Sequence, residues 1–189
     1  MADRVEIIRG DARQITFPER PTVVVSEMVG NFVIEEDMLG MFNTIDKKCV
    51  PDVTFIPGAL TLYFAPIHEE GLASELGRLK QIVGEITMES FVGRMVNRPI
   101  HHRVQEAELL GRDLAPLTIK TVRGESDLDE IRCEMVMTRD GLVNAVGTWY
   151  HLDLAPGVTM TTGPDAPANH YPNIKFPVYP PLELKEGDH

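Results

Sequence analysis

The chain has 189 residues, 43% of them hydrophobic and 25% charged, which is enough to bury the core of one domain without disulfides or metal ions. Its 29 acidic residues outnumber 18 basic ones and give a net charge of -11, which argues against nucleic acid as a partner, because binding its backbone needs Lys and Arg. No apolar run approaches the roughly 20 residues that cross a bilayer, and the first residues lack the pattern of a signal peptide. We therefore expect a cytoplasmic protein without a membrane partner.

The first 50 residues predict a fragment of a parallel α/β sheet. Short strands are expected at residues 5–8 and 22–25, and the β-branched apolar run of the second is typical of a strand buried on both faces. Acidic residues followed by an apolar face predict a helix over residues 35–42. Two strands and one helix cannot complete a doubly wound sheet, so we expect a further segment or another chain to supply the rest.

From residue 51 onward the pattern predicts an antiparallel β body. Strands are expected at 54–56, 59–64, 117–122, 131–137, 142–154 and 158–161, with a hairpin turn at 139–141 and Cys133 buried in its strand. Apolar residues spaced by three and four predict one long helix over residues 69–96. The tail over residues 176–184 holds three prolines and is expected to run extended along the surface.

Two glutamates form the most informative pair. Glu27 ends the strand at 22–25, at the edge where open α/β sheets bind ligands, and Glu36 follows nine residues later across a loop that begins at Gly30. Two carboxylates that face one point can hold a guanidinium through paired charge-assisted hydrogen bonds. The same positions also suit a solvated strand end and a helix-capping acid, so spacing alone leaves both interpretations open.

The segment Ser26-Glu27-Met28-Val29-Gly30 with Glu36 resembles the double-glutamate loop of the protein arginine methyltransferase family. The resemblance continues through residues 55–63 and 140–150 to a loop over 159–173, in which His170 is kept and Tyr171 replaces the family's Trp. It implies an α+β fold, with a remnant of a Rossmann-like α/β sheet in residues 1–50. An antiparallel methyltransferase-type β-barrel domain follows in 51–189, with a helical arm at about 69–96. Glu27, Glu36, His170 and Tyr171 become the candidate substrate-binding residues.

The sequence departs from that family at its cofactor site. Family members bind S-adenosylmethionine with a glycine-rich loop and an acidic residue that would precede residue 5, and no GxGxxG pattern occurs in the chain. Arg13 occupies the place where members usually carry a glutamate against the adenine. We therefore expect no cofactor on this chain alone, and S-adenosylmethionine only where a partner chain supplies the site.

Three functions remain open, and the first, without catalysis, is favoured. In the first, the chain is a peptide-binding or recruitment protein, and one setting for it is the maturation of a bacterial peptide natural product. Alternatively, it is the substrate-binding half of a split S-adenosylmethionine-dependent methyltransferase. In the third, it is a peptide-modifying enzyme that uses Glu27, Glu36 and His170 as acid and base. Under each we expect a homodimer or heterodimer, because residues 69–96 match the arm by which family members clasp one another.

No metal site is expected. The six histidines include the adjacent pair His101 and His102, whose side chains would point to opposite faces of a strand. We therefore do not expect His101 and His102 together to share one ion with His68, His151 or His170.

Overall fold

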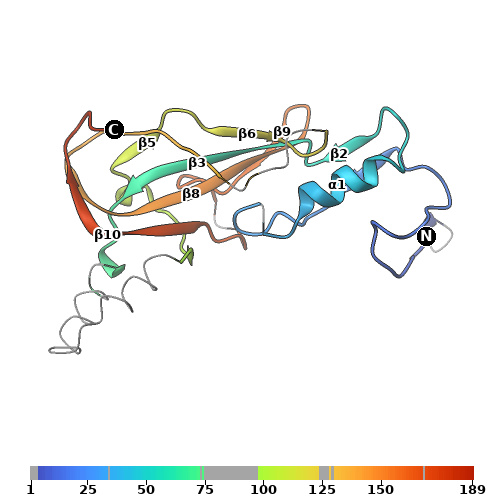
Figure 1. The fold of residues 1–189 in the computed structure, drawn as a ribbon, viewed down its shortest axis with the longest axis horizontal. Helices are drawn as coiled ribbons and strands as arrows, with labels where there is room; N and C mark the ends of the chain where they lie inside the picture. Colours follow the sequence, from blue (N-terminus) through green and yellow to red (C-terminus); the bar gives the residue numbers. More distant parts are fainter. Residues whose placement is uncertain are drawn as a thin grey trace.

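A six-stranded antiparallel sheet forms most of the molecule (Figure 1). The computed structural model describes residues 4–33, 35–72, 74, 98–123, 128, 130–167 and 169–189. The sheet has the order β4-β10-β8-β3-β6, with β9 paired to β8. Its strands are β3 (Ala59–Ile67), β4 (Ile100–His101), β6 (Leu117–Lys120), β8 (Gly141–Ala155), β9 (Val158–Thr161) and β10 (Ile174–Leu184). The predicted α+β class and strands at 59–64, 117–122, 142–154 and 158–161 are confirmed, with small shifts at their ends.

A second, two-stranded sheet lies beside α1 at the other end of the molecule (Figure 1). β1 (Val23–Val25) pairs in parallel with β2 (Thr54–Ile56), and α1 spans Met38–Asp46. Val23 and Val25 share one face of β1 and are 51% and 69% exposed, because no described segment covers that face. The prediction of a strand buried on both faces was therefore wrong. The strand predicted at residues 5–8 is absent, because no neighbour offers it a ladder, and Ile7 is 90% exposed.

The C-terminal tail runs extended, and its residues 176–184 are half-buried or exposed, as predicted. It also forms a strand that was not predicted, β10, which lies between β4 and β8 in the sheet. Pro177 pairs opposite Ala145, and the ladder resumes at Leu182 opposite Val143, with a shift of register between them. Proline has no N–H to donate, and an irregular segment of this kind tolerates it within a sheet. The proline content alone was therefore misleading.

The turn at residues 139–141 does not form the predicted hairpin. β7 (Met135–Met137) pairs with β5 (Gly111–Asp113) in a separate two-stranded sheet, whereas β8 belongs to the large one. β8 instead forms a hairpin with β9 through Pro156 and Gly157, where Gly157 has a φ of 75°. β7 is also shorter than predicted, so Cys133 precedes it and is exposed, contrary to the expected core position, while Cys49 is buried.

One apolar core joins the two ends of the fold. Phe42 of α1, Phe55 of β2, Leu60 of β3 and Tyr150 of β8 belong to the same buried cluster. The packing is thus continuous across residue 50, and the division into domains 1–50 and 51–189 stays a prediction. Most of the helical arm predicted over 69–96 lies outside the described residues.

No helix in the described part of the chain combines the length and the apolar character needed to span a bilayer.

Candidate functional site

The loop between β1 and α1 has an unusual backbone. Gly30, Val33 and Asp37 have φ values of 52°, 66° and 54°, in the left-handed region that side chains other than glycine rarely adopt. Val33 is β-branched and fully buried, so the surrounding core must impose this conformation on it. The loop holds both candidate glutamates, and its shape is therefore set by packing beneath it.

Glu27, His170 and Tyr171 come together in the structure. The Tyr171 hydroxyl donates a hydrogen bond to Glu27 Oε1, and His170 Nε2 lies 3.6 Å from the same oxygen. The hydrogen bond from Tyr171, followed by that from His170, lowers the pKa of Glu27 below its ordinary value. The Glu27 side chain nevertheless stays 75% exposed. The result is an ionised carboxylate that is held in place and open to a ligand.

Glu36, the second candidate glutamate, affects the pKa of the Tyr171 hydroxyl. Burial raises the pKa of Tyr171 to about 12, and the negative charges of Glu27 and Glu36 add to this effect. Tyr171 therefore stays protonated at neutral pH and can donate its hydrogen bond to Glu27. Glu36 is exposed and forms no ion pair among the described residues, so its carboxylate is accessible, and it lies near enough to Tyr171 for its charge to act there.

Tyr150 supports the loop from below, a role that the sequence did not indicate. Its side chain is 1% exposed, and its hydroxyl donates to the carbonyl of Gly30 at 3.1 Å. Its ring also meets that of Tyr171 edge-on, with centroids 6.4 Å apart. No local signal in the sequence reveals the contact of Tyr150 with a loop 120 residues away.

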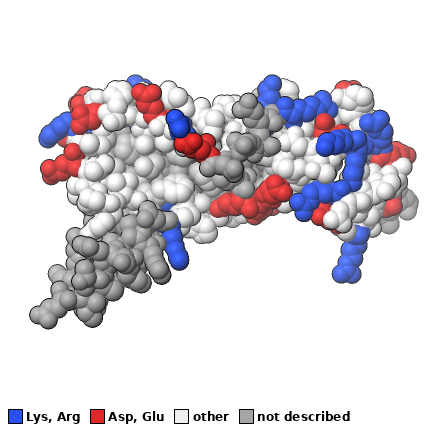
Figure 2. Space-filling model, viewed as in Figure 1, with Lys and Arg blue, Asp and Glu red and all other residues white. Residues whose placement is uncertain are grey.

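Arg13 is engaged by acids of its own chain. Its guanidinium binds the Asp11 carboxylate at 3.0 Å and reaches Asp37, which precedes α1, at 3.2 Å. Figure 2 shows Lys and Arg gathered at the end of the molecule that carries the N-terminus and α1, despite the net negative charge of the chain. At the position where the resemblance implies an adenine contact, the structure thus has an arginine in ion pairs.

The histidines contact different partners in the structure. His101 Nε2 lies 3.1 Å from the side-chain amide nitrogen of Asn31, whereas His102 contacts Glu108. His68 contacts the carbonyl of Leu142, and His151 lies 3.7 Å from Asp153.

Replacing Tyr171 with Phe should raise the pKa of Glu27 toward its ordinary value of 4.5, because the hydroxyl is the largest cause of the lowered value. At a pH between the lowered pKa and 4.5, Glu27 would be mostly ionised in the wild type and mostly protonated in the variant. A carboxyl-carbon NMR titration measures this directly. Tyr63→Phe, on β3, serves as the control, and an unchanged Glu27 titration in Tyr171→Phe would contradict the assigned contact.

The chain is similar to arginine methyltransferases over its whole length. It is 23% identical over 197 residues to protein arginine N-methyltransferase 1 of Schizosaccharomyces pombe, covering 100% of this chain and 58% of that protein. It is 24% identical over 226 residues to protein arginine N-methyltransferase PRMT10 of Oryza sativa subsp. japonica, covering 100% and 59%. Over 171 residues it is 23% identical to the arginine N(omega)-methyltransferase of Streptomyces achromogenes, covering 88% and 46%. No protein-family model matches the chain.

Solved structures show the same fold. The chain superposes with a TM-score of 0.85 and 20% identity on a chain of the Trypanosoma brucei PRMT1 enzyme-prozyme heterotetrameric complex with AdoHcy, covering 96% of this chain and 60% of that one. Arabidopsis thaliana protein arginine methyltransferase 10 gives a TM-score of 0.73 at 18% identity, covering 98% and 64%. The predicted resemblance is confirmed, and the chain spans less than two thirds of the length of each of these proteins.

Proposed function

We propose that the chain binds an arginine side chain of a peptide or protein through the carboxylates of Glu27 and Glu36. The observation that carries this proposal is the exposed Glu27 carboxylate, which Tyr171 and His170 hold in its ionised form. The similar proteins named above are arginine methyltransferases, which supports arginine as the recognised residue.

The geometry suits a guanidinium better than an ammonium. Tyr171 and His170 both contact Oε1 of Glu27, and in the described residues Oε2 has no such contact. A guanidinium presents several N–H groups in one plane and can bridge Glu27 Oε2 and Glu36, whereas a lysine ammonium is a point charge. The net charge of -11 adds a long-range attraction for a cationic peptide.

A set of three matched peptides tests the proposal. They differ at one position, which is arginine, citrulline or lysine, and are titrated calorimetrically into the purified chain. We expect the citrulline peptide to bind about tenfold more weakly or worse, because citrulline keeps the shape of arginine and loses its charge. Equal affinities for arginine and citrulline would contradict the proposal.

We further propose that this binding serves recruitment, with S-adenosylmethionine supplied, if at all, by another chain or segment. The ion pairs of Arg13 with Asp11 and Asp37 support this, since they occupy the place of the expected adenine contact. A setting in the maturation of a bacterial peptide natural product stays a prediction. Titration of S-adenosylmethionine and its demethylated product into the chain should give no binding heat, and micromolar binding of either would contradict this part.

The exposed face of β1 favours a second candidate, half of a split methyltransferase. Val23 and Val25 point to one face of β1 and leave apolar surface there, which a partner that packs on this face would cover. Among the described residues, β1 is paired with β2 alone. In this candidate a partner pairs with β1 and supplies the methyl donor. Light scattering tests self-association: assemblies larger than 21.1 kDa that Val25→Asp dissociates would support pairing of two copies through β1, and an intact assembly in that variant would contradict it.

A further inference from the structure

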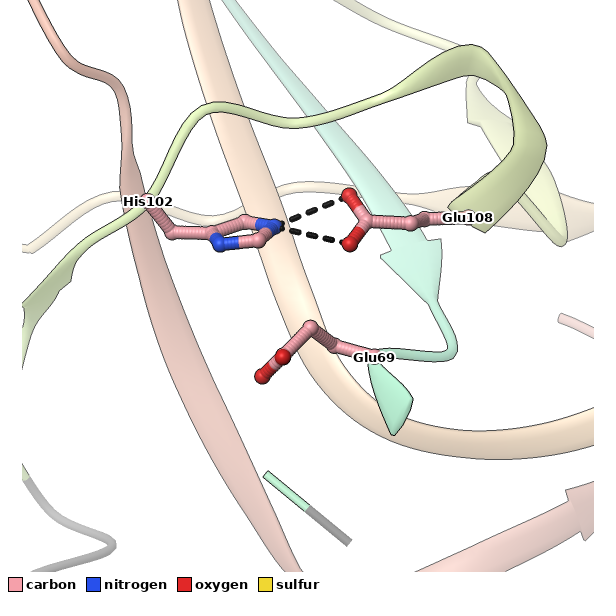
Figure 3. A group of neighbouring side chains, drawn as sticks. All are labelled: Glu69, His102 and Glu108. Carbon is pink, nitrogen blue, oxygen red and sulfur yellow. Dashed lines mark hydrogen bonds and ion pairs between the residues drawn. The ribbon is translucent and has the colours of Figure 1, made fainter. Parts of the chain in front are cut away.

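Three side chains that could bind a metal converge at the end of the large sheet (Figure 3). Glu69 lies two residues after the end of β3, His102 directly follows β4, and Glu108 ends a short 3-10 helix, η2 (Glu106–Glu108). Each offers one ligand atom, and these atoms all lie within 4.8 Å of one another. The side chains are only 14%, 19% and 17% exposed, so the group is largely screened from solvent.

His102 and Glu108 are nearly far enough apart to be two ligands of one ion. His102 Nε2 lies 2.8 Å and 3.0 Å from the two carboxylate oxygens of Glu108. Nitrogen and oxygen ligands of a tetrahedral zinc ion, with bonds of about 2.0–2.2 Å, lie roughly 3.3 Å apart. A small outward shift of either side chain therefore makes room for an ion, once His102 releases its Nε2 proton.

Glu69 is fixed in position before any ion binds. Its backbone N–H donates to Asn144 Oδ1 at 2.9 Å, and Asn144 Nδ2 donates to its carbonyl at 2.8 Å. Its carboxylate accepts hydrogen bonds from the Leu72 N–H and from the buried Lys175 ammonium. A second cation in this position would compete with Lys175.

A cavity borders the two carboxylates of the group. It has a volume of about 750 Å³, and Glu69 and Glu108 line it together with Glu70, His68 and Arg139. Its three glutamates outnumber its one arginine, which favours cations near the group. An ion can therefore reach the carboxylates of Glu69 and Glu108 from the cavity without unfolding of the sheet.

We propose that a zinc ion binds between the carboxylates of Glu69 and Glu108 and Nε2 of His102. Three protein ligands leave the fourth tetrahedral position to a water molecule from the cavity, and Lys175 turns away from Glu69. The imidazole favours zinc over magnesium or calcium, which take oxygen ligands. The bound ion joins the ends of β3 and β4 to η2, and the site does not depend on arginine binding at Glu27. The sequence alone predicts no metal site, and of the adjacent pair His101 and His102 only His102 takes part in the site proposed here.

Zinc competition with a chromophoric chelator, on chain purified without a histidine tag, tests the site. We expect one zinc ion per wild-type chain, and about tenfold or weaker affinity in His102→Gln, which removes a ligand. His101→Gln is the matched control and should bind as the wild type does. Lys175→Met should bind zinc about tenfold more tightly, because it removes the competing cation.

Two outcomes would overturn the proposal: a wild type that binds no zinc, or equal affinities of the wild type and His102→Gln. Circular dichroism checks that His102→Gln is folded. If His102→Gln does not fold, the test uses Lys175→Met instead. We then expect zinc to raise the melting temperature of Lys175→Met more than that of the wild type. An equal or smaller rise would contradict the competition between zinc and Lys175.

Discussion

Replacing Glu27 with Gln lowers the affinity for an arginine peptide by about 10- to 100-fold, if the carboxylate grips the guanidinium as proposed. Glutamine keeps the size of the side chain and can still accept the hydrogen bond from Tyr171. It removes the negative charge and presents an amide in place of one carboxylate oxygen. Calorimetric titration with the arginine and citrulline peptides measures the change.

The citrulline peptide makes this experiment specific. If only the charge pairing is lost, Glu27→Gln strongly weakens binding of the arginine peptide and hardly changes binding of the citrulline peptide. The substitution in the protein and the one in the peptide are then energetically coupled. Glu36→Gln should show the same coupling if both carboxylates hold one guanidinium. Glu19→Gln, an exposed acid outside the loop, is the matched control for net charge. Equal losses for the two peptides, or losses in Glu19→Gln, would contradict the assigned role.

The strands of the large sheet could be predicted because their local pattern is strong. β3 alternates between half-buried and buried residues over positions 59–64, and β8 does so over positions 148–152, with the period of two typical of a half-buried strand. β10 could not be predicted in the same way. Its prolines argue against a strand, and they are accommodated only by a shift of register against β8, which depends on the partner strand.

The candidate site shows the same contrast. The resemblance indicated Glu27, His170 and Tyr171, and the structure brings these three into contact. Neither the position of Tyr150 beneath the loop nor the left-handed backbone at Val33 could be predicted, because both depend on packing between distant segments. The group of Glu69, His102 and Glu108 was missed for a similar reason: its members come from three elements and follow no spacing motif.

A second large effect is expected when Phe42 is replaced by Ala. Phe42 is fully buried in α1, and its ring lies against that of Phe55 in β2, with centroids 4.7 Å apart. Removing a buried phenylalanine ring costs about 3–5 kcal/mol of the free energy of unfolding, because apolar contacts are lost and a cavity remains. Since Phe42 shares one core with Leu60 and Tyr150, this loss should reach the large sheet as well.

Trp149, the only tryptophan in the sequence, reports on that sheet. It lies in β8 and stacks on Tyr63 of β3 with ring centroids 5.7 Å apart. In denaturant unfolding, Phe42→Ala should move the Trp149 fluorescence transition and the far-ultraviolet circular dichroism transition together to lower denaturant. Val158→Ala, at a position 53% exposed, should change the stability by less than about 0.5 kcal/mol. A Trp149 transition that stays in place while helical signal is lost earlier would mean that α1, β1 and β2 unfold as a separate unit. That result would favour the domain boundary predicted near residue 50 over a single cooperative core.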